Sequence, residues 1–425
     1  MSIYDNAGVV LIPSGYKAGT TDNLYSVLPA NGNGDFNATR GSTATRINKD
    51  GFIESVAADV PRLDYPLIDG VVQDCPALLL EPQRMNSLLQ SNQFNTTWAL
   101  SSSIALTSGQ SGVGGSTDAW LLKKTDASSR YIIQNITLIS STYSYSVFAK
   151  KESGNWLYVR LSDSGGSLAS TSYFDLENGV VGSTSADSLS IHSYKNGWYR
   201  CEVKFTHSIG FVRMYPAVGD GSPSGGSGGE GIYIQNAQLE QGSYPTSYIP
   251  TLTSAVTRSA DVCNGSGTSA DFNDSEGVLF TEIAALSDTT TAYTSIGVGS
   301  GSSSNRIGLG FNPSSQIYVY KNTTTSWVAT QNANIELFNK VALSYNTNDN
   351  EFWLNGFKVS TNTTIGDIAQ PNELRFSASY GGEQFFGNTK QLMTFKTALT
   401  DSELEQITSW TSFGEMAKGQ LYTIE

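Results

Sequence analysis

Two aromatic residues lie in turn-rich segments of the second half of the chain, where side chains commonly reach solvent. Trp327 follows the polar run at residues 322–326, and Tyr380 precedes a pair of glycines. The apolar C–H face of a sugar can pack on the ring of an exposed aromatic residue. Trp327 and Tyr380 are therefore the candidates for carbohydrate binding, whereas most of the seven tryptophans are expected in the core.

Carboxyl groups and histidines show no arrangement that predicts catalysis. Hydrolysis of a glycosidic bond needs two carboxyl groups that flank the bond. The spacing Glu-x-Asp-x-x-Glu is absent, and Glu351 has no carboxylate partner two or four residues further along. His192 and His207 are the only histidines, and neither lies in a His-Glu-x-x-His motif. We therefore expect no catalytic residues and a protein that is not an enzyme.

An oxygen-rich turn at residues 273–277 offers candidate ligands for calcium. Its side chains include Asp274 and Glu276, and Ca²⁺ takes roughly six to eight oxygen ligands. A solvated turn without a metal is the alternative, and no other cofactor is expected. The three cysteines have no zinc-ligand spacing, so we expect all of them to be small buried residues; they are Cys75, Cys201 and Cys263.

The composition describes an acidic chain with few charges. Its 425 residues carry a net charge of −13, and only 15% of them are charged. Phosphate backbones and anionic membrane surfaces attract basic faces, so nucleic acids and membranes are not expected as partners. The first residues form no basic and apolar leader, and no run approaches the roughly 18 apolar residues of a transmembrane helix. We expect synthesis in the cytoplasm.

The segment at residues 231–261 divides the chain into two β-rich bodies. It begins with a strand pattern and then crosses Pro245 and Pro250, which lack amide donors and end any ladder. Before it, alternation such as that at residues 199–205 is typical of half-buried antiparallel strands. We predict an all-β fold with a jelly-roll sandwich at residues 94–250, a linker at 251–261 and a second sandwich at 262–425.

Residues 1–93 contain only short apolar pieces between closely spaced turn signals. The pieces at residues 9–12, 24–28 and 78–80 are too short for helices and too few for an independent core. We expect an extended region that becomes ordered by docking on a partner protein or on further copies of the chain. Such a region would serve attachment and oligomerisation. An ordinary small β-subdomain is the alternative.

The second body contains the helix that the sequence predicts most clearly. Thr400 and Glu403 have the spacing of a capping box, so a short helix should begin there. Leu404 and Ile407 lie three residues apart and would pack one face of that helix on the sandwich.

Several short motifs resemble a family of tailed-phage virion proteins that includes tail fibres, head fibres and other appendages. The resemblance covers most of the first 261 residues. The body at 94–250 is similar to carbohydrate-binding jelly rolls, and the second body resembles concanavalin-like and laminin-G-like lectin domains. The virion motifs are GSTATRIN at 41–48, PRLDY at 61–65, LLLEPQRMN at 78–86, QLEQG at 238–242, PTSYIP at 245–250 and TRSAD at 257–261, and the lectin-like ones are VALSY at 341–345, FWLNG at 352–356 and FKTALTDSEL at 395–404.

The resemblances imply a virion structural protein, made in the host cytoplasm and carried on the surface of the phage particle as a tail or head fibre. Residues 1–93 would contact other virion proteins, and the sandwiches would bind glycans or proteins of the host surface, or glycans of the environment. Weak single sites gain from being linked, so we expect a homo-oligomer, with a trimer favoured over a dimer. A capsid decoration protein without binding activity and a polysaccharide depolymerase are the alternatives.

Overall fold

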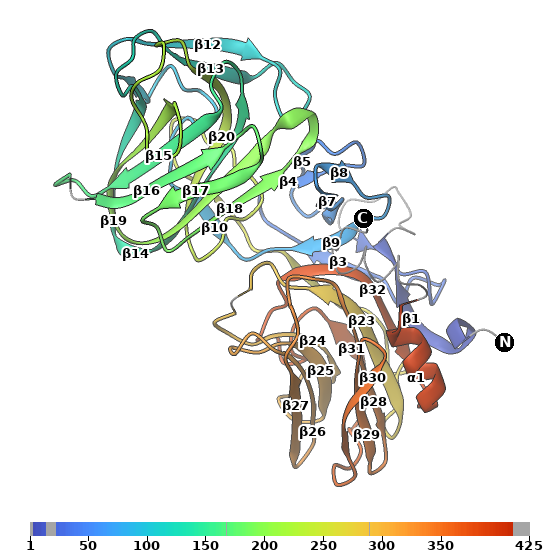
Figure 1. Ribbon diagram of the computed structural model, residues 1–425. Helices are drawn as coiled ribbons and strands as arrows, with labels where there is room; N and C mark the ends of the chain where they lie inside the picture. The colour runs from blue at the N-terminus through green and yellow to red at the C-terminus, as the bar shows by residue number, and fades with distance from the viewer. Residues whose placement is uncertain (1–2, 14–22, 167, 289, 411–425) are drawn as a thin grey trace.

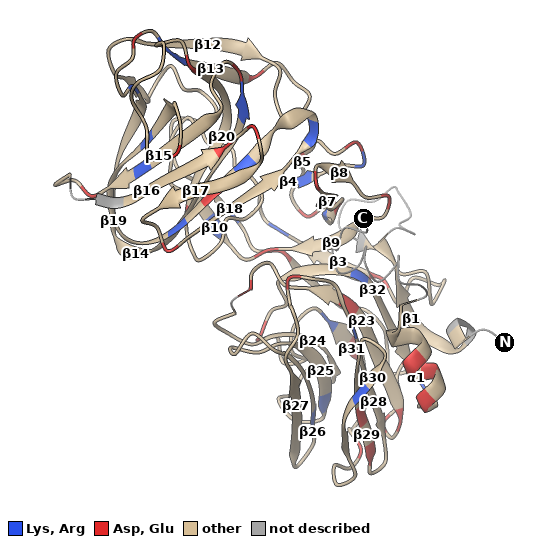
Figure 2. Cartoon of the chain, in the orientation of Figure 1, with Lys and Arg blue, Asp and Glu red and all other residues tan. Residues whose placement is uncertain are grey.

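The computed structural model describes residues 3–13, 23–166, 168–288 and 290–410, which form two antiparallel β-sandwiches (Figure 1). The predicted all-β fold is confirmed. The helical pieces with described bounds are short: η1 (Ile3–Asn6), η3 (Lys195–Gly197) and α1 (Asp401–Thr408). No helix of the described chain is long and apolar enough to cross a membrane. Charged residues are thinly spread over both sandwiches (Figure 2).

The first sandwich is built from one ten-stranded sheet. Eight of its strands have the order β12-β13-β20-β14-β19-β15-β16-β17, while β11 also pairs with β14 and β18 also pairs with β19. Two strands, β14 and β19, are long enough to serve both of its layers. The first half of β19 pairs with β18 and its second half with β15. The strands are β11 (Ala99–Leu100), β12 (Ile104–Gln110), β13 (Ala119–Lys124), β14 (Ile132–Lys151), β15 (Trp156–Ser162), β16 (Leu168–Asp175), β17 (Val180–Thr184), β18 (Ser188–Ser193), β19 (Tyr199–Ala217) and β20 (Gly231–Gln241).

The alternation in the sequence places the core of the first sandwich correctly. Cys201, Val203 and Phe205 are fully buried together with Tyr145 and Val147 of the neighbouring strand. The expectation that all three cysteines are buried is wrong for one of them. Cys201 and Cys263 are buried, whereas Cys75 is exposed in the connection between β8 and β9, where it has no core to join.

The second sandwich consists of an eight-stranded and a five-stranded sheet, with a large core between them. The eight-stranded sheet has the order β30-β29-β28-β23-β32-β9-β6, and β1 also pairs with β32. Its strands are β1 (Ala7–Leu11), β6 (Leu63–Asp64), β9 (Ala77–Leu80), β23 (Gly277–Ala284), β28 (Asn339–Asn346), β29 (Asp349–Leu354), β30 (Phe357–Asn362) and β32 (Gly387–Phe395). The five-stranded sheet contains β24 (Thr294–Gly299), β25 (Arg306–Phe311), β26 (Ile317–Asn322), β27 (Ser326–Gln331) and β31 (Glu373–Arg375).

The N-terminal region differs from the extended attachment region that the sequence suggested. Its strands β1 and β9 both pair with β32, more than 300 residues further along, and so widen the sheet of the second sandwich. The remaining short strands form small ladders: β2 (Asn23–Leu24), β3 (Phe36–Thr39) and β22 (Val262–Asn264); β4 (Ala44–Ile47) and β5 (Ile53–Val56); β7 (Leu67–Ile68) and β8 (Val71–Val72); β10 (Arg84–Asn86) and β21 (Val256–Arg258).

The predicted helix is confirmed as α1. Thr400 caps it, since its side chain accepts a hydrogen bond from the amide of Glu403 while the Glu403 carboxylate accepts from the amide of Thr400. Leu404 and Ile407 are buried against the outer face of the eight-stranded sheet, in a cluster that includes Phe280 and Trp353. The helix therefore covers the side of that sheet opposite the main core.

The motifs that resemble virion proteins meet in a buried cluster of ions between the two sandwiches. Arg62 donates to Glu81 at 2.6 Å and also to Asp261, and Arg258 donates to Glu81. Arg40 donates to the other oxygen of Asp261 at 3.0 Å. All five side chains are at most 6% exposed. We call these residues the junction cluster, because they tie the N-terminal region to the segment that connects the sandwiches.

Candidate functional site

Four tyrosines form a row across the outer face of the first sandwich. Tyr158 on β15 is the register partner of Tyr173 on β16 and of Tyr215 on β19. Tyr131, directly before β14, lies beside Tyr215 with ring centroids 5.0 Å apart. The rings of Tyr158 and Tyr173 are stacked at 4.4 Å, and those of Tyr158 and Tyr215 at 4.5 Å. We call this row the tyrosine rung.

The tyrosine rung faces away from the core because successive residues of a strand point to opposite faces. Leu157 and Val159, the neighbours of Tyr158, belong to the core. The stacked rings cover one another's faces, so Tyr158 is only 6% exposed. Within the described chain, the hydroxyls of Tyr158 and Tyr173 have no hydrogen-bond partner and are not buried atoms. The rung therefore presents polar ring edges to solvent.

The hydroxyls of the tyrosine rung stay protonated over the physiological range. Burial raises the pKa of Tyr158, and the neighbouring Tyr215 and Tyr173 raise it further. Burial likewise raises the pKa of Tyr173 and Tyr215. A neutral phenol is both a donor and an acceptor, as are the hydroxyls of a sugar.

A second row, two residues further along the same face, carries two arginines. Arg160 on β15 and Arg213 on β19 are register partners. The Arg213 guanidinium lies over the Tyr131 ring at 4.4 Å and over the Phe211 ring at 4.2 Å. Such cation–π contacts hold the guanidinium in place, and Arg213 also hydrogen-bonds the side chain of Tyr215. We call Arg160 and Arg213 the arginine rung.

The two rungs, with Trp156 and Phe211, form a continuous surface that we call the platform (the strands that carry it are seen in Figure 1). Trp156 is half-buried and lies on the same face, two residues before Tyr158. Gly182 on β17 makes room for it, since a Cβ there would lie 2.8 Å from the Trp156 ring. Aromatic surface beside fixed hydrogen-bonding groups is the combination that sugar rings require.

Sequence reasoning missed every residue of the platform. The signal was present in the alternation of β15, where Trp156, Tyr158 and Arg160 share the face opposite Leu157 and Val159. The partners Tyr131, Tyr173 and Tyr215 could not be added, because only the strand register brings them together.

The expectation that Trp327 is exposed is wrong. Its strand β27 alternates, and Trp327 lies on the inner face with 9% exposure, packed in the core of the second sandwich. The polar run before it forms the turn, and the ring itself points inward with Ala329. Its neighbour Val328 takes the outer face and is 54% exposed.

Tyr380 is 43% exposed, but one face of its ring is covered. The Arg306 guanidinium lies 4.6 Å from the centre of the Tyr380 ring and 4.7 Å from that of Tyr320. The Tyr380 hydroxyl donates to Glu383 at 2.9 Å. Trp327 packs in the core on the inner face of its sheet, whereas Tyr380 shares the Arg306 guanidinium with Tyr320, which lies outside that core, so the two candidates do not form one site.

The candidate calcium turn is held by hydrogen bonds within the chain. Glu276 accepts from the amide of Ala398 at 3.0 Å, and the carbonyl of Asn273 accepts from the hydroxyl of Tyr345 at 2.8 Å. The backbone carbonyl of Asp274 accepts from the amide of Ile368. In the described part of the chain, His, Cys, Asp and Glu do not gather in threes at distances that would hold a metal ion.

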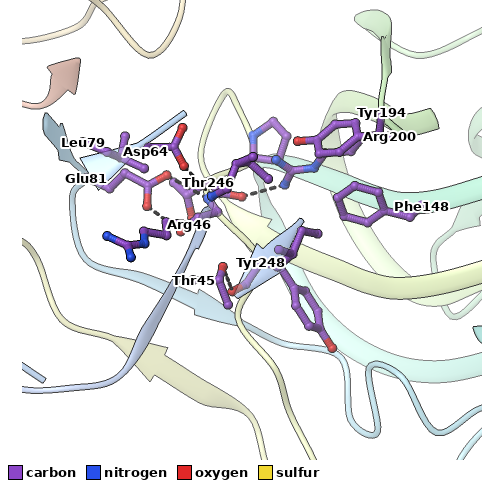
Figure 3. A pocket seen from close by; sticks show the side chains of 14 residues that line it. Thr45, Arg46, Asp64, Leu79, Glu81, Phe148, Tyr194, Arg200, Thr246 and Tyr248 are labelled. Atoms are coloured by element: carbon purple, nitrogen blue, oxygen red, sulfur yellow. Dashed lines mark hydrogen bonds between the residues drawn. The ribbon is translucent and has the colours of Figure 1, made fainter. Parts of the chain in front are cut away.

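A cavity of about 160 Å³ adjoins the junction cluster (Figure 3). Figure 3 shows Asp64, Arg200 and Tyr194 around it, with Arg200 donating to the carbonyl of Thr246 at 2.6 Å. The Asp64 carboxylate accepts from the amide of Ile47 at 2.7 Å. Burial raises the pKa of Asp64 to about 7, against the lowering effect of that amide and of nearby Arg62.

A polar groove runs between the sandwiches as two connected hollows of about 580 and 600 Å³. Both hollows are lined by Lys204 and Tyr244 of the first sandwich and by Ser287 of the second. His192 lies in one of them, 3.4 Å from Glu202. The hydrogen bond and charge of Glu202 raise the pKa of His192.

No protein-family model matches the chain, and no curated protein matches it. Matching solved structures include the carbohydrate-binding module CBM40 of a Ruminococcus gnavus IT-sialidase bound to α2,3 sialyllactose, with 16% identity, a TM-score of 0.29, and 32% of this chain and 84% of that chain covered. Domain 4 of the Geobacillus stearothermophilus arabinanase AbnA, in complex with arabinotriose, has 13% identity, a TM-score of 0.30, and coverages of 35% and 73%. Likenesses at this level do not extend to function.

Proposed function

We propose that the protein is a non-catalytic carbohydrate-binding protein and that the platform is its glycan site. The observation that carries the proposal is the register of the tyrosine and arginine rungs on one outer face. The half-buried rings of Tyr131, Trp156 and Phe211 offer apolar surface for sugar C–H groups, and the edges of the stacked phenols and the guanidinium groups offer hydrogen bonds.

The resemblance of residues 41–261 to tailed-phage proteins extends this proposal to a virion appendage. In that setting several copies, as in a homotrimer, would project the platform toward host-surface or environmental glycans. Linking weak sites raises the overall affinity without new contacts. The junction cluster supports the role, because its buried ion pairs tie the N-terminal region to the segment that connects the sandwiches.

The glycan proposal is tested by screening the full chain on an array of neutral and acidic oligosaccharides. We expect binding that is lost in Tyr131→Ala and in Trp156→Ala, which replace two of the three half-buried aromatic residues of the platform. Tyr293→Ala is the matched control, since Tyr293 is 46% exposed on the second sandwich. Loss of binding in the control alone, or no binding to any oligosaccharide, would contradict the proposal.

The appendage proposal is tested by immunogold localisation of the chain on purified phage particles. Label on tail tips or on fibres is the expected result. Uniform label on the capsid, together with no binding on the glycan array, would instead indicate a decoration protein. Release of reducing ends from host polysaccharides by the purified chain would indicate a depolymerase.

A further inference from the structure

We infer that the arginine rung selects acidic glycans by binding a sugar carboxylate. The inference rests on the proposed glycan site and names the class of sugar that it takes. The first observation concerns pairing. Of the eleven arginines of the chain, eight form ion pairs with carboxylates; Arg160 and Arg213 belong to the three that form none within the described residues.

This lack of counter-ions runs against the composition. The chain has 38 acidic and 25 basic residues, so an arginine has many carboxylates available. Two like charges directly opposite each other on neighbouring strands destabilise the pair. Arg160 and Arg213 are such direct partners, and the Nε atoms of both are buried without an acceptor. A bound anion that meets the solvent-facing ends of both guanidinium groups would relieve this repulsion.

The geometry of the rung suits one carboxylate. Opposed side chains on neighbouring strands begin about 5 Å apart, so two guanidinium groups can approach a single anion. A guanidinium presents paired N–H groups that match the two oxygens of a carboxylate. Arg213 is already fixed between the rings of Tyr131 and Phe211, so little side-chain entropy remains to be lost on binding.

The tyrosine rung would hold the rest of the same sugar. Its neutral hydroxyls lie two residues away along each strand, at Tyr158 beside Arg160 and at Tyr215 beside Arg213. The chain as a whole is acidic and repels anionic polymers, so binding requires a local positive site. The arginine rung would therefore supply charge selection, and the tyrosine rung would supply contacts that neutral sugars share.

The test compares acidic oligosaccharides with their methyl esters by calorimetry on the full chain. The probes are oligomers of galacturonic acid, of hyaluronan and of α2,8-linked N-acetylneuraminic acid. We expect at least one acid to bind about tenfold or more tightly than its ester, because a charge-assisted hydrogen bond is lost on esterification. Arg160→Gln and Arg213→Gln should each remove this preference, and Arg160→Lys should retain part of it.

Arg375→Gln is the control, since Arg375 is ion-paired with Glu373 on the second sandwich at 2.6 Å. Thermal unfolding of each variant separates loss of binding from loss of fold. Equal binding of every acid and its ester, or an unchanged preference in both Gln variants, would overturn the inference. Tyr131-dependent binding of neutral oligosaccharides alone would overturn it while leaving the proposed glycan site intact. No binding of any oligosaccharide would overturn both.

Discussion

Glu81 is the residue on which the junction cluster depends. It accepts hydrogen bonds from Arg62 and Arg258. It also accepts from the amide and from the hydroxyl of Ser247, and both of these Ser247 distances are 2.7 Å. Burial alone would raise the pKa of Glu81, but Arg258, Arg62 and Ser247 together hold it well below its usual range. The carboxylate is thus ionised in the folded protein, and two buried arginines rely on it.

Replacing this carboxylate should destabilise the protein strongly. Glu81→Gln leaves Arg62 and Arg258 without their shared counter-charge, and an uncompensated buried charge costs about 3–5 kcal/mol. Glu54→Gln is the matched control, because Glu54 pairs with Arg46 at 2.6 Å but both side chains are about a third exposed; it should cost less than about 1 kcal/mol. Chemical denaturation measures both. Equal effects of the two variants would contradict the role of Glu81.

Asp64 makes the stability depend on pH near neutrality. Its pKa is about 7 in the folded protein and 3.8 when unperturbed. Between these values the folded state holds the proton more tightly than the unfolded state, so this residue costs stability as the pH rises. Asp64→Asn keeps an acceptor for the Ile47 amide. It should be more stable than the wild type at pH 8, with the difference closing below about pH 4. Denaturation curves of identical pH slope would contradict this.

At the scale of single residues, sequence reasoning recognised motifs but not their chemistry. Arg62, Glu81, Arg258 and Asp261 lie in three separate motifs, and only the fold brings their charges together. Trp327 shows the opposite failure. A polar run before an aromatic residue suggested exposure, yet the parity of the strand decides the direction of the ring.

At the scale of elements, the N-terminal strands complete a sandwich formed by the far end of the chain. Val9 and Leu11 of β1, and Leu78 and Leu80 of β9, are buried in the core of the second sandwich. The shortness of these apolar pieces had indicated that they lack a core of their own. These strands are buried in the core of the second sandwich instead. Local sequence does not indicate a pairing strand that lies more than 300 residues away.

Weakening β9 should therefore destabilise the second sandwich. Leu78 is fully buried, and Leu78→Ala should lower the free energy of unfolding by about 2–5 kcal/mol through lost burial and the cavity left behind. Val71→Ala, at a 63% exposed position on β8, is the control and should change it by less than about 0.5 kcal/mol. A fragment of residues 262–425 alone should show no cooperative unfolding. Cooperative unfolding of the fragment, or an unchanged free energy of unfolding in Leu78→Ala, would show that β9 is dispensable.

Regular elements were predictable where one pattern ran for several residues. The alternation at residues 199–205 and the capping box at Thr400 both gave the observed structure. The passage of β14 and β19 from one layer of the sandwich to the other was not predictable, because it depends on register shifts such as the one between Leu138 and Ser141. The platform depends on this passage, because its rungs use the end of β19 and Tyr131, the residue directly before β14.

At the scale of the whole molecule, two sandwiches with different outer faces are joined by a buried ionic junction. The first carries the platform, and the second is covered by α1 and by the Arg306 stack with Tyr320 and Tyr380. The groove between them is a separate polar surface. Under the proposed function, the first sandwich binds glycan and the second, completed by the N-terminal region, supports it.

The most direct test is hydrogen–deuterium exchange of the full chain with and without the oligosaccharide bound most tightly on the array. Ligand should protect the four segments that carry the platform: residues 131–135, 156–162, 170–175 and 211–217. The corresponding segments of the second sandwich, such as 293–299 and 376–384, should exchange unchanged. Protection confined to these segments of the second sandwich, or to the groove residues 188–204 and 285–294, would contradict the assignment of the glycan site.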